Sequence, residues 1–380
     1  MEEICNRNLE FEVPSKIVIG NGVVEEIGKE AIKIGSEKVL IVTDRAIVEA
    51  GIYAKVQDSL ERVGLESTLF QGVEPDPRTE IINDCLRSMG DRFDLVVGLG
   101  GGSSLDIAKI ISVMITNSGK IEDYLGIDKI PKPGIPKFLI PTTAGTGSEV
   151  TPYAILTDDK ERLKKAVVSS YLFADIAIID PLLTITLPPK ITSYTGMDAL
   201  THAIETYTST KATIFSDMLA LEAIKLISEN LPVTMNHGDD ISARYKMSMA
   251  SLLAGLNLHS TGTGAVHALA YPLGGMFNIP HGIANSLLLP YVMEFNLPST
   301  IVKYSKISET MAGDSSADVV KVVKKLSRKL AIPQHLRDLE IPRDAITALA
   351  KRAMQVTRLL ANNPRKVTLQ DAIEIYKMAY

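Results

Sequence analysis

Short apolar segments alternate with amphipathic segments in the first half of the chain. Four runs of aliphatic and β-branched residues are apolar enough to be buried on both faces, at residues 38–43, 93–99, 137–140 and 176–179. The intervening segment 49–64 carries apolar residues at helical spacing. Alternating strands and helices are typical of strand-helix-strand units, in which the strands are parallel. The pattern predicts an α/β domain with a mostly parallel sheet over residues 1–185.

The apolar spacing changes beyond Asp180-Pro181. Pro188-Pro189 interrupts the chain, and the apolar residues that follow recur with a period near 3.6. This pattern predicts an all-helical domain over residues 186–380, with helices at 216–230, 243–256, 284–296, 318–330 and 369–379. Because 380 residues exceed the size at which one core stops growing, two domains with a ligand-binding cleft between them are expected.

Composition and charge exclude several classes of protein. A hydrophobic fraction of 46% and a net charge of −5 describe an ordinary globular chain, and its longest charge-rich stretch is the short segment 158–165. This argues against a nucleic-acid partner, which would require phosphate neutralisation. The two cysteines, Cys5 and Cys85, have no disulfide-scaffold or metal-site spacing, which favours a reducing cytoplasm. The acidic N-terminus and the lack of a long apolar stretch predict neither export nor membrane insertion.

A glycine-rich loop lies between a predicted strand and a predicted helix. The segment 98–106 contains Gly100-Gly101-Gly102-Ser103 and leads into a helix expected at 104–115. Backbone amides and the helix dipole at such a junction can receive a phosphate, and glycine lets the anion approach closely. The spacing is not G-x-G-x-x-G, and a glycine-rich turn can also serve a steric purpose alone.

Two further features support a dinucleotide site. Asp44 closes the strand at 38–43, where a carboxylate can bind the adenosine ribose and repel a 2′-phosphate; this favours NAD over NADP. The alternative for Asp44 is a helix N-cap. The segment 141–151 concentrates hydroxyls directly after another strand, and these can bind pyrophosphate and the nicotinamide amide. The alternative for this segment is a polar surface turn.

Four residues form a candidate metal site. Asp198 and His202 lie one helical turn apart, so both side chains project from the same face. His267 and His281 lie in apolar segments, where a neutral imidazole needs a partner, and a shared cation would serve all three histidines. One carboxylate with three imidazoles suits Fe²⁺, Mn²⁺, Co²⁺ or Zn²⁺. Each residue alone also fits a surface pair or a core histidine bonded to a carbonyl.

Together these segments resemble the iron-containing (group III) alcohol dehydrogenase family, which is related in fold to glycerol dehydrogenase and dehydroquinate synthase. The resemblance covers nearly the whole chain and is carried by Gly100–Ser103 with Asp106, residues 141–151, residues 196–205, and His267 through Gly282. It implies a dehydroquinate synthase-like fold with an α/β dinucleotide-binding domain and an all-helical metal-binding domain. The implied enzyme transfers hydride between a small alcohol and NAD and uses Fe²⁺ or Zn²⁺. It is expected to form a homodimer or larger homo-oligomer in the cytoplasm.

The resemblance also assigns residues by position. The metal ligands would be Asp198, His202, His267 and His281. The cofactor residues would be Asp44, Asp76, Gly101, Gly102, Ser103, Asp106, Thr142, Thr143, Thr146, Ser148, Thr151 and Lys164. Within this set the glycines and Ser103 cradle the pyrophosphate, Asp44 and Asp76 lie by the adenosine half, and Lys164 reaches the cofactor ribose.

One position departs from the family. Many members carry a histidine four residues after the third ligand, where this chain has Tyr271. That histidine is not a ligand, so metal binding is expected to survive. A phenol with a pKa of roughly 10 cannot replace an imidazole as a proton carrier near neutral pH.

Other functions fit the same two sites. A glycerol or polyol dehydrogenase, or a hydroxyacid-oxoacid transhydrogenase, would differ only in the pocket walls. A non-catalytic dinucleotide-binding sensor is the alternative from another class, although a sensor does not need four metal ligands. The apolar residues Leu269 and Phe277 near the ligands suggest a small aliphatic substrate.

Overall fold

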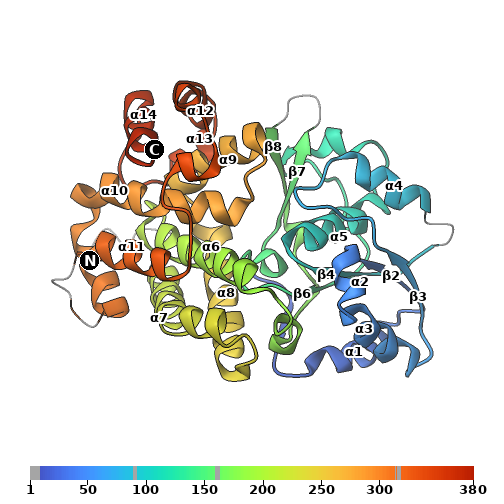
Figure 1. Cartoon of the computed structure of the whole chain (residues 1–380). Helices are drawn as coiled ribbons and strands as arrows, with labels where there is room; N and C mark the ends of the chain where they lie inside the picture. The colour runs from blue at the N-terminus through green and yellow to red at the C-terminus, as the bar shows by residue number, and fades with distance from the viewer. Residues whose placement is uncertain (1–8, 89–91, 159–162, 313, 315–317) are drawn as a thin grey trace.

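The computed structural model describes residues 9–88, 92–158, 163–312, 314 and 318–380. Two domains lie side by side: an α/β domain built from the N-terminal half and a helical domain built from the C-terminal half (Figure 1). This arrangement confirms the predicted fold class. The predicted boundary between residues 185 and 186 stays a prediction; it falls between η5 (Pro181–Thr184) and α6 (Pro189–Thr208).

A six-stranded parallel sheet forms the centre of the α/β domain, in the order β1-β9-β6-β4-β2-β3. A second sheet pairs β7 and β8 antiparallel, with β5 parallel to β8. The strands are β1 Lys16–Ile19, β2 Lys38–Val42, β3 Glu66–Phe70, β4 Leu95–Gly100, β5 Gly126–Ile127, β6 Lys137–Pro141, β7 Tyr153–Asp158, β8 Leu163–Val168 and β9 Ile176–Ile179. The helices are η1 Val23–Glu26, α1 Ile27–Lys33, α2 Arg45–Glu49, α3 Ile52–Glu61, α4 Glu80–Ser88, α5 Gly102–Met114, η2 Ile121–Tyr124, η3 Ser148–Val150, η4 Ser170–Leu172 and η5.

The four predicted strands are the four inner strands of the large sheet. β2, β4, β6 and β9 are almost entirely buried, which explains their continuous apolar runs. The sequence missed β1 and β3, which lie at the two edges and are partly exposed, and it missed the β7–β8 hairpin. The helix predicted at 49–64 is wrong as a single element, because Gly51 adopts a left-handed φ of 73° and separates α2 from α3.

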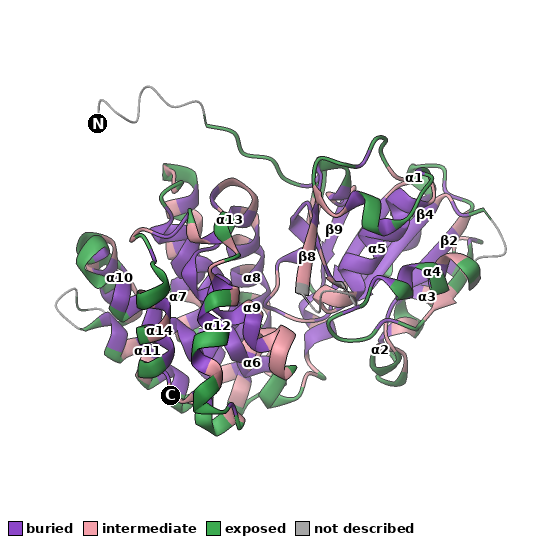
Figure 2. Cartoon of the chain, turned by 90° about the horizontal axis from the view of Figure 1, so that it is seen from above, coloured by how far each residue is buried: buried purple, intermediate pink, exposed green. Residues whose placement is uncertain are grey.

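Among the described residues, every element from Pro189 onward is helical, as predicted. The helices are α6, α7 Ile214–Asn236, α8 Ile241–Thr261, α9 Ala265–Phe277, α10 His281–Ala312, α11 Val319–Lys329, η6 Leu336–Leu339, η7 Arg343–Ala345, α12 Ile346–Ala353, α13 Thr357–Leu360 and α14 Leu369–Met378. α6 is buried along most of its length at the centre of this domain, packed against α7, α8 and α10. Each domain has its own buried interior (Figure 2).

The two domains meet closely where η3 contacts α8. Gly147, with a left-handed φ of 63°, lies against Gly255, and a Cβ built on Gly255 would lie 2.7 Å from the Cα of Gly147. Only two glycines permit this backbone approach. The contact therefore fixes the 141–151 segment of the α/β domain against the helical domain.

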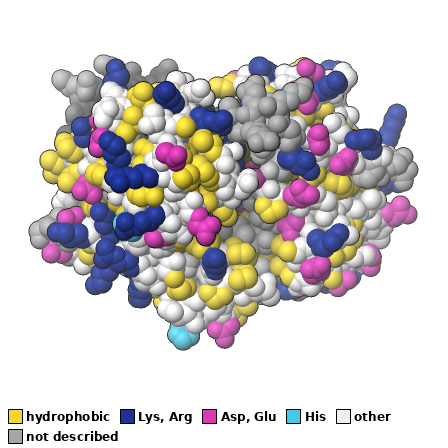
Figure 3. All heavy atoms as spheres, turned by 45° about the horizontal axis from the view of Figure 1, so that its top comes forward, with side chains coloured by type: hydrophobic (Ala, Val, Ile, Leu, Met, Phe, Trp, Pro, Cys, Tyr) yellow, Lys and Arg dark blue, Asp and Glu magenta, His cyan; other side chains and the backbone are white. Residues whose placement is uncertain are grey.

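The surface carries charged side chains of both signs. The face in Figure 3 mixes basic, acidic and hydrophobic side chains, with lysines and arginines gathered over the helical domain. Cys85 is a buried thiol whose pKa is raised to about 12 by burial, while Cys5 lies outside the described residues. No helix within the described residues has the length and apolarity needed to cross a membrane.

Candidate active site

Three helices bring four potential metal ligands together. Asp198 and His202 project from α6, His267 from α9, and His281 from the first residue of α10. One ligand atom from each of the four lies within 4.8 Å of all the others. Asp198 Oδ1 lies 4.0 Å from His202 Nε2 and 3.9 Å from His281 Nε2. The separations suit atoms that share one cation.

The protonation states of these groups also suit a cation. Burial lowers the pKa of His281 to about 3 and lowers the pKa of His202, so both imidazoles are neutral near pH 7. Burial alone would raise the pKa of Asp198, but attraction to His202 and His281 holds it below its usual value. Neutral imidazoles beside an ionised carboxylate are the ligand forms that divalent metals bind.

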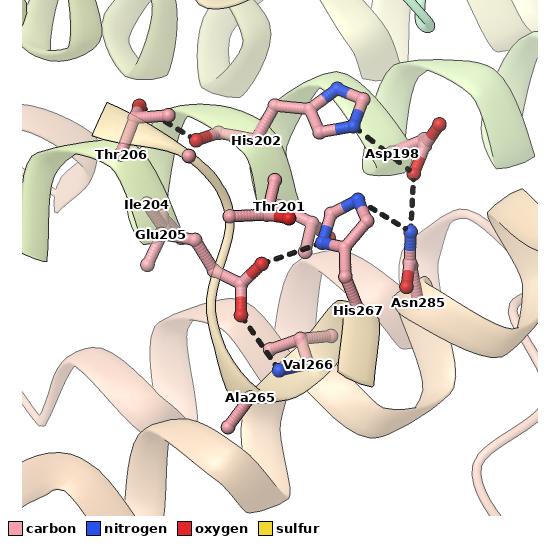
Figure 4. Close-up of polar contacts among 12 residues, drawn as sticks. Asp198, Thr201, His202, Ile204, Glu205, Thr206, Ala265, Val266, His267 and Asn285 are labelled. Atoms are coloured by element: carbon pink, nitrogen blue, oxygen red, sulfur yellow. Dashed lines mark hydrogen bonds and ion pairs between the residues drawn. The ribbon is translucent and has the colours of Figure 1, made fainter. Parts of the chain in front are cut away.

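Hydrogen bonds to neighbouring groups orient the imidazoles (Figure 4). The Nδ1 of His267 donates to Glu205 Oε2 at 2.5 Å, and the other oxygen of Glu205 accepts the backbone N–H of Val266 at 2.6 Å. The Nδ1 of His202 donates to the carbonyl of Gly145 at 3.2 Å. Because each Nδ1 carries the proton, each Nε2 keeps a lone pair for a metal.

Asn285 of α10 links three of the four ligands. Its amide nitrogen lies 2.7 Å from Asp198 Oδ1 and 3.0 Å from the Nε2 atoms of His267 and His281. The side chain is fully buried, and its carbonyl oxygen has no hydrogen-bond partner among the described residues. The amide hydrogens of Asn285 therefore point at the lone pairs that a metal would take, and the contacts with the two Nε2 atoms must give way when a metal binds.

Sequence reasoning missed Glu205 and Asn285. Glu205 stood in the 196–205 segment without a role, and Asn285 stood four residues after His281. A carboxylate one turn beyond His202 in an apolar helix is the signal that was available, because a buried acid needs a partner.

A cavity of about 240 Å³ is lined by residues of both domains. The four candidate ligands form one end of its wall, and Gly102, Ser103, Asp106, Thr146, Ser148, Thr151, Asp76 and Lys164 line the rest with apolar side chains such as Leu258 and Leu359. Leu269 is fully buried in the helical core, and neither it nor Phe277 lines the cavity. The expectation that these two residues shape the substrate pocket is therefore wrong.

The glycine-rich loop opens α5 as predicted. Gly101 is the N-cap residue and no side chain caps the helix, so its first amide groups face no side-chain acceptor. Gly100 has a φ of 145°, and a Cβ there would lie 2.7 Å from Ser104 Oγ. Both features suit an anion at this helix start.

The hydroxyl-rich segment packs beside this loop. Thr146, Ser148 and Thr151 line the cavity, whereas Thr142 and Thr143 lie behind it. The side-chain oxygens of Thr142 and Thr143 are buried without a hydrogen-bond partner among the described residues. Buried unpaired hydroxyls are uncommon, and because these two do not line the cavity, a ligand inside it would not reach them without a local shift.

Three charged residues assigned to the cofactor occupy different environments. Asp44 caps α2 through the Ile47 amide at 3.1 Å, as its alternative interpretation predicted, and its second oxygen accepts from Ser104 Oγ at 3.2 Å. It lies beside the glycine-rich loop but does not line the cavity. Asp76 and Lys164 do line it and form an ion pair of 2.5 Å.

Tyr271 lies at the end of the cavity that the four candidate ligands form, which we call the metal end; the opposite end, at the start of α5, is the cofactor end. It lines the cavity, and its ring centroid is 6.0 Å from that of His281. Burial raises the pKa of its phenol, so the group stays protonated near neutral pH. His259 contacts the cavity residue Tyr153 at 3.2 Å without lining the cavity itself.

Two family models match the chain in succession. Iron-containing alcohol dehydrogenase covers residues 14–181, and Fe-containing alcohol dehydrogenase family, C-terminal, covers residues 192–380. The chain is 41% identical over 374 residues to long-chain-alcohol dehydrogenase 1 of Geobacillus thermodenitrificans, covering 95% of this chain and 94% of that protein. It is 36% identical to NAD-dependent methanol dehydrogenase of Bacillus methanolicus, covering 97% and 99%.

Solved structures agree with these matches. The crystal structure of a 1,3-propanediol oxidoreductase superimposes with a TM-score of 0.96 at 35% identity, covering 98% of this chain and 100% of that one. The matches extend through both domains and both ends of the cavity. The chain belongs to the iron-containing alcohol dehydrogenase family, and it is an NAD-dependent, metal-dependent enzyme that interconverts alcohols with aldehydes or ketones.

Proposed function

We propose that Asp198, His202, His267 and His281 hold the catalytic iron and that NAD lies along the α5 end of the same cavity, with a primary alcohol between them. One observation carries this proposal: the four metal-binding donors and the uncapped start of α5 border a single cavity. The donor set and its protonation states fit a divalent cation. The uncapped amides at the start of α5 fit the pyrophosphate of a dinucleotide.

At the metal end, the residues of this chain bind and orient. Iron, when bound, supplies Lewis-acid polarisation of the substrate oxygen. Glu205 fixes the ring orientation of His267, and the Gly145 carbonyl does the same for His202. Asn285 holds the Asp198 carboxylate by donating to its Oδ1, while its contacts with the Nε2 atoms of His267 and His281 give way to the metal. The near-complete burial of Asp198, His202 and His267 excludes water from this end of the cavity.

At the cofactor end, the residues of this chain bind a dinucleotide. NAD supplies the hydride acceptor. In our proposal Gly101, Gly102 and Ser103 receive the pyrophosphate, and Asp44 faces the adenosine ribose, where its charge disfavours a 2′-phosphate. The Asp76–Lys164 ion pair borders the ribose side of the cavity, with Lys164 as the donor. Thr142, Thr143, Thr146, Ser148 and Thr151 form the nicotinamide side.

The substrate class follows from the remaining wall. Leu258, Leu359 and Tyr271 line the cavity together with Thr263 and Arg358, and the two leucines offer apolar surface to an aliphatic chain. Long-chain-alcohol dehydrogenase 1 is 41% identical to this chain over 374 residues, and NAD-dependent methanol dehydrogenase is 36% identical over 378 residues. We therefore propose unbranched primary alcohols as substrates.

The proposal is tested by anaerobic purification, metal analysis and NADH formation across primary alcohols of increasing length, diols and glycerol. We expect close to one iron per chain, activity that is lost on chelation and restored by Fe²⁺, and a preference for primary alcohols. Full activity in metal-free protein would contradict the ligand assignment. Preference for glycerol would replace the substrate proposal with the polyol alternative.

We also propose a homodimer or larger homo-oligomer working in the cytoplasm. Ile214, Phe215 and Met218 at the start of α7 are all more than half exposed, at 65%, 54% and 66%. Exposed apolar groups of this kind support self-association. The spacing of the two cysteines, which is not that of a disulfide scaffold, supports a reducing compartment. Light scattering of the purified enzyme measures the oligomeric state, and a monomer would contradict the first part.

A further inference from the structure

Lys109 of α5 is a fully buried lysine beside the cofactor end of the cavity. Its ammonium donates to Ser148 Oγ at 2.7 Å, to the carbonyl of Tyr153 at 2.7 Å, to Asp106 Oδ1 at 3.2 Å and to Thr151 Oγ1 at 3.3 Å. Its exposed fraction is 0%. A lysine is seldom buried in this way unless its charge is paired, and here one ammonium joins α5, η3 and β7.

These contacts leave Ser148 and Thr151 with no hydrogen to donate. Ser148 Oγ accepts from Lys109 and donates its single hydrogen to Asp106 Oδ1 at 2.6 Å. Thr151 Oγ1 accepts from Lys109 and donates to the backbone carbonyl of Ser148 at 3.3 Å. An ammonium can only donate and an ionised carboxylate can only accept, so the direction of these bonds is fixed.

Asp106 is held in place by the same network. Its second oxygen, Oδ2, accepts the backbone N–H of Ile155 at 2.9 Å, so both carboxylate oxygens are engaged. Asp106, Ser148 and Thr151 all line the cavity, whereas Lys109 does not. Any ligand that reaches the two hydroxyls therefore meets lone pairs and must itself supply the hydrogen.

We propose that Lys109 is a positioning residue that, with Asp106, fixes Ser148 and Thr151 as hydrogen-bond acceptors, and that these acceptors select the carboxamide NH₂ of the nicotinamide ring. This inference rests on the proposed binding of NAD along this wall. The carboxamide is the N–H donor on the nicotinamide ring, and its amide hydrogens match two neighbouring lone pairs. Lys109 thus governs recognition of the cofactor without touching it.

The chain offers a matched control for removing a buried ammonium. Lys137 of β6 is also buried, with an exposed fraction of 5%, and pairs with Asp175 at 3.5 Å. It lines no part of the cavity. Lys109→Met and Lys137→Met therefore remove the same group from the same domain, but only the first removes a hydrogen-bond donor that positions the Ser148 and Thr151 oxygens.

The test compares dissociation constants for NAD and for its 3-acetylpyridine analogue, in which a methyl ketone replaces the carboxamide. Calorimetric titration of the full-length holoenzyme without alcohol measures binding independently of turnover. We expect wild type and Lys137→Met to bind NAD about tenfold more tightly than the analogue, the effect of one or two hydrogen bonds. Lys109→Met should bind the two ligands with nearly equal affinity.

Two further variants decide the question if Lys109→Met does not fold. Ser148→Ala and Thr151→Val keep the lysine and remove one acceptor each, and both should lower the discrimination between NAD and the analogue. Wild-type discrimination in both would overturn the proposal. Equal loss of discrimination in Lys109→Met and Lys137→Met would also overturn it, because the effect would then follow from removing any buried ammonium. Absence of NAD binding by wild type would instead contradict the proposed function.

Discussion

The two ends of the cavity are built in different ways. At the metal end, side chains from α6, α9 and α10 meet, and other side chains or a backbone carbonyl orient them. At the cofactor end, loops present backbone amides and hydroxyls, and the charged pair Asp76–Lys164 is partly open to solvent. Removing a partner of a buried charge has a large free-energy cost, because the charge is left without compensation. The cost is smaller for a partly exposed charge, because water screens it. Changes at the metal end should therefore have the larger effects.

The largest expected effect is the loss of a metal ligand. We expect His267→Ala to lower iron affinity by more than ~100-fold, beyond the range for partners that only orient a ligand, and to abolish turnover. Metal analysis after gel filtration and NADH formation are the measurements. The control is His237→Ala, which removes an exposed histidine at the end of α7. A His267→Ala enzyme that kept its iron and activity would remove this residue from the ligand set.

Removing an orienting carboxylate should cost less. Glu205→Gln keeps the size of the side chain but loses the charge that accepts from His267 Nδ1 at 2.5 Å. We expect iron affinity to fall about 10- to 100-fold. Competition with a metal chelator measures this change, and Glu222→Gln, an exposed site on α7, is the control. Unchanged affinity would mean that Glu205 contributes to folding alone.

Removing a negative charge at the cofactor end should have a smaller effect, on the preference for NAD over NADP. Asp44→Asn removes the negative charge but keeps the cap of α2, because asparagine caps a helix as well as aspartate does. We expect the ratio of kcat/KM for NAD to that for NADP to fall about tenfold, equivalent to ~1.4 kcal/mol. Asp240→Asn changes another N-cap aspartate, at α8 in the helical domain, and should leave the ratio unchanged. If Asp44→Asn also leaves it unchanged, Asp44 is only a helix cap.

The smallest expected effect concerns proton transfer beside the metal end. The raised pKa of Tyr271 keeps its phenol protonated across neutral pH, so it adds no step to the pH-rate profile there. Tyr271→His introduces a group that accepts a proton once pH exceeds its pKa, so alcohol oxidation should rise through that range while iron content stays constant. Comparison with Tyr271→Phe over pH 5 to 9 tests this. Identical profiles would show that the position is catalytically idle.

The sequence pointed to the four candidate metal ligands, but it did not point to the residues that hydrogen-bond to the ligands or to the cavity wall. Asp198 and His202 were recognisable because an interval of four places them on one helical face. Glu205, Asn285 and Lys109 make their contacts with residues 62, 87 and 39 positions away in the chain, and no local pattern encodes such pairings.

In the fold, too, elements with a clear local pattern were predicted from the sequence, and elements without one were missed. Inner strands were predicted because burial on both faces leaves a continuous apolar run. β1 and β3 lie at the sheet edges and are partly exposed; β1 has only three apolar residues, and β3 begins with three polar residues, so neither has a long apolar run. The assignment of Asp44 showed a further limit, because a helix cap and a ribose contact require the same residue at the same junction.

The contact between Gly147 and Gly255 determines how far apart the two reacting partners can be. Hydride passes only between atoms that nearly touch, and in the proposed function one partner is bound by each domain. Because a Cβ at Gly147 would lie 2.5 Å from the Cα of Gly255, any larger residue would act as a wedge and widen the gap across the cavity. Gly147 lies between the cavity residues Thr146 and Ser148, so a substitution there would also move the wall of the cavity.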